Sequence, residues 1–279
     1  EYYKIKKFSC DSSQAVNTAP PTTCFFVKSW GSQGSADGQF DFPTGIDVDS
    51  NHNVYVTEME NHRVQVFDSN GNFLRKFGSL GRNNGQFDAP TGITIDQDNN
   101  IYVVDNSRVQ KFDSNGRFLR SYNTNSGWDV VLGSSNNFFV SQGHQVNEFN
   151  INTGSRSVPT FLEFSTRFNR SHSLDFDSFN KNLFFATTDR IFRINRDDNS
   201  QNLVFGSFGS GNGQLNYALG LDIDYSNNYL YEADTTNGRV QIFTLNGRYV
   251  NQFGNTGPIN SRITNPRDVA YDYHDGDHF

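Results

Sequence analysis

The sequence is short of cysteine, methionine and long apolar runs. Two cysteines, Cys10 and Cys24, and a single methionine, Met59, occur in 279 residues. No stretch of about 18 apolar residues is present, so we expect no membrane insertion. Hydrophobic residues make up only 34% of the chain, whereas aromatic residues reach 15%. This balance favours short, half-exposed strands joined by polar turns over a protein of buried helices.

Positive charge is also scarce. The chain has 23 Lys and Arg against 30 Asp and Glu, which gives a net charge of -7. An acidic surface repels phosphate backbones, and the short "KIKK" at residues 4–7 does not offset it. We therefore predict that the partners do not include nucleic acid.

Two features point to the extracellular space. Cys10 and Cys24 lie close in sequence and predict a disulfide that closes an N-terminal loop, with two unrelated thiols as the alternative. The triplet Asn-Arg-Ser at Asn169 predicts N-glycosylation. The chain starts at Glu1 rather than at a methionine, so we expect a processed form or one part of a longer protein. The cysteine pair and the Asn169 triplet together predict a secreted glycoprotein.

One phrase recurs along the chain. "GQFDFPTGIDVD" at Gly38–Asp49 returns as "GQFDAPTGITID" at Gly85–Asp96. Aligning the residue that precedes each apolar-x-apolar triplet gives six anchors, at intervals of 47, 37, 44, 47 and 48 residues. The anchors are Gly45, Gly92, Asp129, Ser173, Gly220 and Asp268. The sequence therefore contains six copies of a unit of about 45 residues.

Each copy carries signals for four strands. In the first copy these are "GIDVD", "VYVTE", "RVQVF" and "NFLRKFG", separated by turn-forming residues. Four antiparallel strands in about 45 residues are typical of a propeller blade. We therefore predict an all-β fold, a six-bladed β-propeller. Aromatic residues near the ends of the fourth strands are predicted to pack between blades: Phe77, Tyr122, Phe208 and Phe253.

The segment "FPTGIDVDSNHNVYVTEMENHRVQVF" at residues 42–67 resembles an NHL repeat. The usual form of that repeat is P-x-G-hydrophobic-x-hydrophobic-D, then N-hydrophobic-Y-hydrophobic-x-D/E, then N-x-R-hydrophobic. The first, second and fifth copies match it well, whereas the third and fourth have lost the Pro and the Asn-x-Arg turn. The resemblance implies six blades. It also implies that Arg63 and Arg239, which follow Glu58 and Asp234, brace the turn between the second and third strands.

The sixth copy is incomplete at the C-terminal end. "RDVAYDYHDGDHF" from Arg267 supplies one inner strand and a turn, whereas "EYYKIKKFS" and "CFFVKSWGS" near the N-terminus look like third and fourth strands. We therefore predict a single domain, 1–279, whose last blade is closed by strands from both termini, about 1–32 and 265–279. Its second strand is missing from this pattern. We expect the protein to continue beyond Phe279, with a strand donated by another copy, and hence self-assembly, as the alternative.

Propellers bind ligands near the axis, where the loops that enter the inner strands converge. The residues just before the anchors, and two of the anchors themselves, are therefore candidate ligand-binding residues. They are Thr44, Thr91, Trp128, Asp129, His172, Leu219, Arg267 and Asp268. These side chains suit a small polar ligand or a peptide carboxylate, and the alternative is a solvated channel mouth.

Signals for a metal or for catalysis are weak. His172 is the one histidine that maps to the channel mouth, so the three-His zinc site of the amidating lyases, which are six-bladed relatives, cannot be assembled there. A series of oxygen-bearing residues mimics the spacing of a calcium loop, but its sixth position is His52 rather than Gly. That series is Asp47, Asp49, Asn51, Asn53 and Glu58. We predict no catalytic residue and no cofactor, with bound calcium as a minor alternative.

These observations predict a secreted, non-catalytic interaction or scaffold module. Its partner is expected to be a protein, a peptide or a glycan that meets the loop face of the propeller. One alternative is a metal-dependent enzyme, similar to a lactonase or a lyase, with a site on the axis. The other is a structural subunit of an extracellular filament or matrix.

Overall fold

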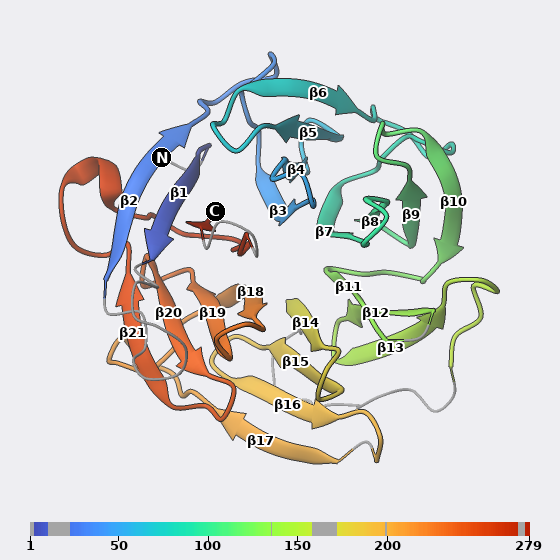
Figure 1. The fold of residues 1–279 in the computed structure, drawn as a ribbon. Helices are drawn as coiled ribbons and strands as arrows, with labels where there is room; N and C mark the ends of the chain where they lie inside the picture. Colours follow the sequence, from blue (N-terminus) through green and yellow to red (C-terminus); the bar gives the residue numbers. More distant parts are fainter. Residues whose placement is uncertain (1–2, 11–22, 135, 158–171, 199, 273–276) are drawn as a thin grey trace.

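Six β-sheets stand radially around a common axis, and in five of them the strand that comes first in the sequence lies nearest the axis (Figure 1). The computed structural model describes residues 3–10, 23–134, 136–157, 172–198, 200–272 and 277–279. Within these residues every regular element is a β-strand except the short 3-10 turn η1 (Ile259–Ser261). None of the described residues forms a helix that is long and apolar enough to cross a membrane. The predicted all-β propeller is confirmed.

Five of the sheets are built from strands that follow one another in the sequence. The first is β3 (Pro43–Val48), β4 (Val54–Glu58), β5 (Arg63–Phe67) and β6 (Phe73–Phe77). The second is β7 (Pro90–Ile95), β8 (Ile101–Asp105), β9 (Arg108–Phe112) and β10 (Phe118–Asn123). The third has three strands among the described residues, β11 (Val130–Leu132), β12 (Asn137–Gln142) and β13 (Gln145–Asn150).

The fourth and fifth sheets are again four-stranded and antiparallel. The fourth is β14 (Ser173–Asp177), β15 (Asn182–Ala186), β16 (Ile191–Asn195) and β17 (Gln201–Phe205). The fifth is β18 (Ala218–Asp224), β19 (Tyr229–Asp234), β20 (Arg239–Thr244) and β21 (Tyr249–Phe253).

The remaining sheet, called here the composite sheet, joins the two ends of the chain. It contains β2 (Cys24–Trp30), β1 (Ile5–Cys10) and the two-residue β22 (Asp277–His278), in that spatial order (Figure 1). The prediction of a six-bladed ring is wrong at this sheet, which has three strands among the described residues and no regular inner strand. Its inner segment, residues 266–270, is not a regular strand, because a strand needs a paired neighbour along its length and this segment has one only near its end. Five blades are thus contiguous in sequence, and the sixth sheet is partial.

Buried apolar side chains form six clusters, and each cluster is shared by two neighbouring sheets. Ile46 and Phe67 of the first sheet, for example, pack with Ile5 and Phe279 of the composite sheet. Each such side chain contributes roughly 1.5–3 kcal/mol when it is fully buried. The composite sheet shares a cluster with both of its neighbours, so the ring is closed by packing although this sheet is incomplete.

The aromatic residues at the ends of the fourth strands pack between sheets, with one exception. The Phe77 ring lies 5.0 Å from that of Phe112, and Tyr122 and Phe253 are buried. The prediction is wrong for Phe208, which is 67% exposed. Phe208 lies in the loop after β17, and Phe205, the last residue of that strand, takes the packing position against Phe243.

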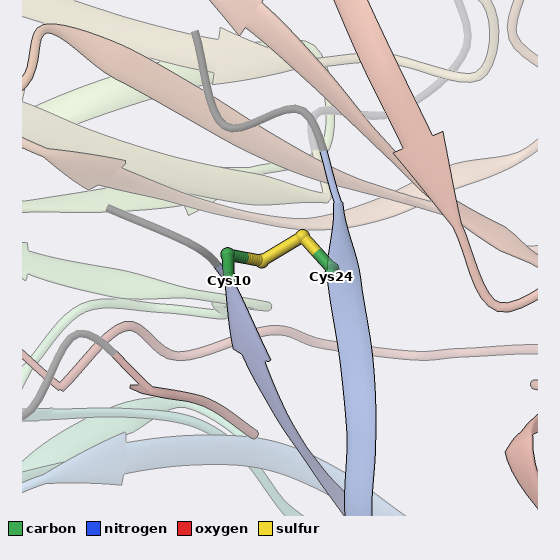
Figure 2. Close-up of a disulfide and its surroundings, with 2 residues drawn as sticks. All are labelled: Cys10 and Cys24. Carbon is green, nitrogen blue, oxygen red and sulfur yellow. A yellow bond between two sulfur atoms is a disulfide. The ribbon is translucent and has the colours of Figure 1, made fainter. Parts of the chain in front are cut away.

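A disulfide joins Cys10 at the end of β1 to Cys24 at the start of β2, as predicted (Figure 2). The two residues are register partners in the sheet and are 14 residues apart in sequence. The link constrains the unfolded chain, and a loop of this length corresponds to about 3 kcal/mol in the chain-entropy description.

We expect the double variant Cys10→Ser, Cys24→Ser to lose about 3 kcal/mol of unfolding free energy, because the unfolded chain regains the freedom of the open loop. Urea unfolding followed by intrinsic fluorescence measures this loss. The unaltered protein treated with reductant is the matched control and should show the same midpoint as the variant. An unchanged midpoint in the variant would contradict the prediction.

Candidate functional site

A cavity of about 700 Å³ opens on the axis, at the face where the loops enter the inner strands. All eight residues that the anchor alignment placed at the channel mouth line this cavity. They are Thr44, Thr91, Trp128, Asp129, His172, Leu219, Arg267 and Asp268. The sequence period therefore placed them correctly, and their role in binding stays a prediction.

The glycine anchors are explained by how closely the inner strands approach one another. A Cβ atom at Gly220 would lie 2.3 Å from the Cα of Asp268 in the composite sheet, and one at Gly92 would lie 2.5 Å from the Cα of Asp129. Real Cβ atoms do not approach backbone atoms this closely, so a side chain at either position would push the two sheets apart. The Gly of the repeat is thus a packing requirement of the ring.

Asp129 and Asp268 lie in the cavity wall, but backbone groups already bind both oxygens of each carboxyl. Asp268 accepts hydrogen bonds from the N–H of Val269, at 2.9 Å, and from the N–H of Ile46 in the next sheet, at 3.0 Å. Asp129 makes the same two kinds of bond, both at 2.8 Å. These carboxyls therefore connect neighbouring inner strands, which leaves the other lining residues as the better candidates for contact with a ligand.

Three further aspartates, each two residues past an anchor, make the same connection between inner segments. Each accepts a hydrogen bond from the next sheet: Asp47 from Ile95 at 2.8 Å, Asp175 from Ile223 at 2.9 Å, and Asp222 from Tyr271 at 2.6 Å. Burial away from water, followed by repulsion from neighbouring axial carboxylates, raises the pKa of Asp47 to about 7.

The other axial carboxyls shift in the same direction. Burial raises the pKa of Asp129 to about 7, and it also raises the pKa values of Asp175, Asp222 and Asp268. The backbone N–H bonds oppose this rise without cancelling it. The axis is therefore a column of carboxyls that bind protons more readily than exposed ones do.

An arc of aromatic side chains forms one side of the cavity. The rings of Trp128 and His172 are 6.0 Å apart, and those of His172 and Tyr217 are 5.6 Å apart. Trp128 is 36% exposed and Tyr217 is 47% exposed, so both present ring surface to the solvent. Such an arc can hold an aromatic or apolar side chain of a ligand by ring contacts.

Phe42 and Tyr217 are among the wall residues that the anchor alignment did not identify. Both lie three positions before an anchor, and both have positive φ, 53° and 64°. Ala89 and Asn265 occupy the same place in other repeats and share this conformation, with φ of 65° and 49°. In three copies this left-handed residue comes directly before the Pro of the repeat. Its fixed place before that Pro is the sequence signal that could have identified the position.

Arg267 is the cation of the cavity wall. Its guanidinium carbon lies 3.8 Å from the centre of the Phe42 ring. Desolvation lowers the pKa of Arg267, because removing a cation from water favours the neutral form. Among the described residues no carboxylate forms an ion pair with it. A partly desolvated cation without a counter-ion favours an anionic group of a ligand.

The carboxylates of the calcium-like series are bound by different partners. Asp49 accepts hydrogen bonds from the N–H groups of Asn51 and Asn53, both at 2.9 Å, which is a turn of the chain. Glu58 accepts from Arg63 at 2.6 Å, and Asp47 accepts from the N–H of Ile95 in the next sheet at 2.8 Å. In the part of the chain that is described, no three His, Cys, Asp or Glu side chains come together as metal ligands do.

Asn169, the predicted glycosylation site, lies outside the described residues, so its glycosylation stays a prediction. Arg63 and Arg239 are confirmed as structural braces, since their Nε atoms lie 2.6 Å from Glu58 and 2.7 Å from Asp234 within buried surroundings.

Comparison with known proteins identifies a repeat family that part of the chain resembles. Residues 40–67 match the family model described as the NHL repeat. Protein brain tumor of Drosophila melanogaster is 35% identical over 85 residues, which are 30% of this chain and 8% of that protein. Protein lin-41 of Caenorhabditis elegans is 44% identical over 48 residues, 17% of this chain and 4% of that protein. The chain thus matches only a small part of the length of either relative.

A solved structure supports the fold over almost the whole chain. A Bacteroides thetaiotaomicron protein of unknown function superimposes with a TM-score of 0.70 at 14% identity, covering 99% of this chain and 75% of that one. At this identity the likeness concerns the fold alone.

Proposed function

We propose that this chain, an NHL-repeat β-propeller, is a non-catalytic interaction scaffold that binds a segment of a partner protein in its axial cavity. The segment has a carboxylate, from its C-terminus or from an acidic side chain, next to an aromatic or apolar residue. The carboxylate meets Arg267, and the ring contacts come from Trp128 and Tyr217.

The observation that carries this proposal is Arg267 itself. It is partly desolvated, it lies over Phe42, and no described carboxylate pairs with it. Hydrogen bonds between a guanidinium and a carboxylate are among the strong ones in proteins, so this position favours an anion more than any other in the cavity wall. The aromatic arc beside it favours a peptide over a bare ion.

We also propose that the composite sheet serves as the sixth blade of the ring and that the protein is secreted. The disulfide between Cys10 and Cys24 supports secretion, because such bonds persist in oxidising compartments. Mass spectrometry of the protein from its natural source tests this directly, with a glycan on Asn169 as the expected result.

Binding can be measured through Trp128, one of two tryptophans in the chain. The probe is a pool of acetylated hexapeptides that end in an aromatic residue and a free carboxylate, with the amidated pool as its match. We expect the free acids to change tryptophan fluorescence, and Arg267→Ala to weaken this binding at least about tenfold, since a hydrogen bond to a charged group is worth about 1.5–3 kcal/mol.

Arg248→Ala is the matched control, because Arg248 is exposed at the turn between β20 and β21, at the other end of the sheet from the cavity. Its affinity should equal that of the unaltered protein. Equal binding of acid and amidated peptides, or full affinity in Arg267→Ala, would refute the proposed site.

A further inference from the structure

The composite sheet contains a gap between β1 and its inner segment. A cavity of about 100 Å³ lies there. Its walls include Lys4 and Ile5 beside the gap, Asp268 and Val269 of the inner segment, and Val240 and Phe253 of the fifth sheet. The cavity is smaller than the ~150 Å³ apolar cavity that holds benzene in an engineered protein, so its free space suits the side chains of a short added strand rather than a separate small molecule.

β22 leads into this gap as the start of a second strand. Phe279 exchanges two backbone hydrogen bonds with Ala270, at 2.9 and 3.1 Å. In the first sheet Tyr55 faces Asp47 in the same way, and both Asp47 and Ala270 lie two residues past an anchor. Phe279 therefore holds the place of Tyr55. Three more second-strand residues follow Tyr55, and the cavity lies where the corresponding three positions of the composite sheet would be.

In the three blades with an Asn-x-Arg or similar turn, the third of these positions is acidic and binds an arginine at the start of the third strand. The pairs are Glu58–Arg63 at 2.6 Å, Asp105–Arg108 at 2.8 Å and Asp234–Arg239 at 2.7 Å. Counting along β1 from its pairing with β22 places Lys4 where these arginines lie. Lys4 is exposed, and no ion pair of Lys4 occurs among the described residues.

The surrounding sheets and the other blades also indicate which side chains suit the first two of the three missing positions. Val56, the first of the three in blade one, packs toward the preceding sheet, where it shares a cluster with Ile5 and Ala270. The equivalent position of the composite sheet faces Val240 and Phe253, which are apolar and buried. The second position is filled in the other blades by a small or β-branched residue: Thr57, Val104 and Ala233.

We infer that this gap is a strand-binding slot for three extended residues that continue the direction of β22 past Phe279. The first residue is apolar, the second is small, and the third is acidic and pairs with Lys4. The strand runs antiparallel to β1, so its backbone completes the sheet while its side chains fill the cavity. Because β22 already points into the slot, we propose that the occupant is a strand joined directly to β22 through Phe279, and not a separate molecule.

The test compares three forms of the protein that extend Phe279 by Val-Thr-Glu, by Val-Thr-Lys or by Gly-Ser-Gly. We expect Val-Thr-Glu to raise the Tm by at least about 3 °C over Gly-Ser-Gly, because a domain of this size gains roughly 2–4 °C for each kcal/mol. Val-Thr-Lys should gain less than half as much. Lys4→Glu should remove the gain of Val-Thr-Glu and restore that of Val-Thr-Lys, which a change in general stability would not do.

Other outcomes would overturn the assignment. Equal Tm values for the three extensions would show that the slot has no preference for the predicted strand. A rise in the Tm of the unextended chain on adding the free peptide His-Phe-Val-Thr-Glu would show that the strand is supplied by another molecule. A Tm of the unextended chain that rises with its own concentration, with dimers in light scattering, would show that a second copy supplies it.

Discussion

Arg63→Ala is expected to cost about 3–5 kcal/mol of unfolding free energy, the usual effect of breaking a buried ion pair from one side. The Nε of Arg63 lies 2.6 Å from Glu58, whose side chain is fully buried. The same guanidinium donates to the carbonyl oxygens of Ser35, Ala36 and Gln39 in the loop that leads to the cavity. Removing it leaves the buried Glu58 without its cation and takes one hydrogen-bond donor from each of the three carbonyl oxygens. Urea unfolding with a two-state fit measures the loss.

The matched control is Lys76→Ala, which breaks an ion pair of equal length at the surface. Lys76 and Asp37 are 2.6 Å apart, with side chains 46% and 51% exposed. Pairs of this kind contribute about 0–1 kcal/mol. The double variant Arg63→Met, Glu58→Leu should recover part of the loss, because it leaves no buried charge. A loss below 1 kcal/mol in Arg63→Ala would show that water reaches Glu58.

Stability should fall as the pH rises from about 4 to about 7. Asp47 and Asp129 have folded-state pKa values of about 7, whereas carboxyls in the unfolded chain titrate near 3.8. In this window the folded protein holds protons that the unfolded chain has released, so a higher pH favours unfolding. Each pKa unit corresponds to about 1.4 kcal/mol, so the two groups together account for several kcal/mol.

Urea midpoints at pH 4.5, 6 and 7.5 test this dependence. Asp47→Asn should flatten the curve, because the amide cannot titrate. Asp37→Asn, which changes an exposed carboxylate, should keep the wild-type slope. Stability that rises with pH over this range would mean that the backbone N–H donors to the axial carboxylates outweigh their burial, and that the column of aspartates is ionised in the folded protein.

The ring and the channel mouth could be predicted from the sequence because both depend on period. Side chains alternate along a strand, and the same phrase returns at each inner strand, so aligned positions occupy equivalent places around the axis. This is why Thr44, Trp128, His172 and Arg267 line one cavity. The pairing of Cys10 with Cys24 was predicted from their closeness in sequence, and the structure places it between two strands of one sheet.

Only the tertiary structure decided what these residues contact. The sequence pattern predicted that Asp268 is available to a ligand. In the structure its carboxyl oxygens accept hydrogen bonds from backbone N–H groups of two sheets, and one of these donors, Ile46, is 222 residues away in the sequence. Phe42 and Tyr217 enter the cavity wall through a left-handed backbone conformation that a hydrophobic pattern does not encode. Phe279, at first assigned to a turn, proved to hold a second-strand position. A sequence pattern indicates which side of a sheet a residue faces. The residues that it contacts depend on how the next sheet packs against that side, which the pattern does not contain.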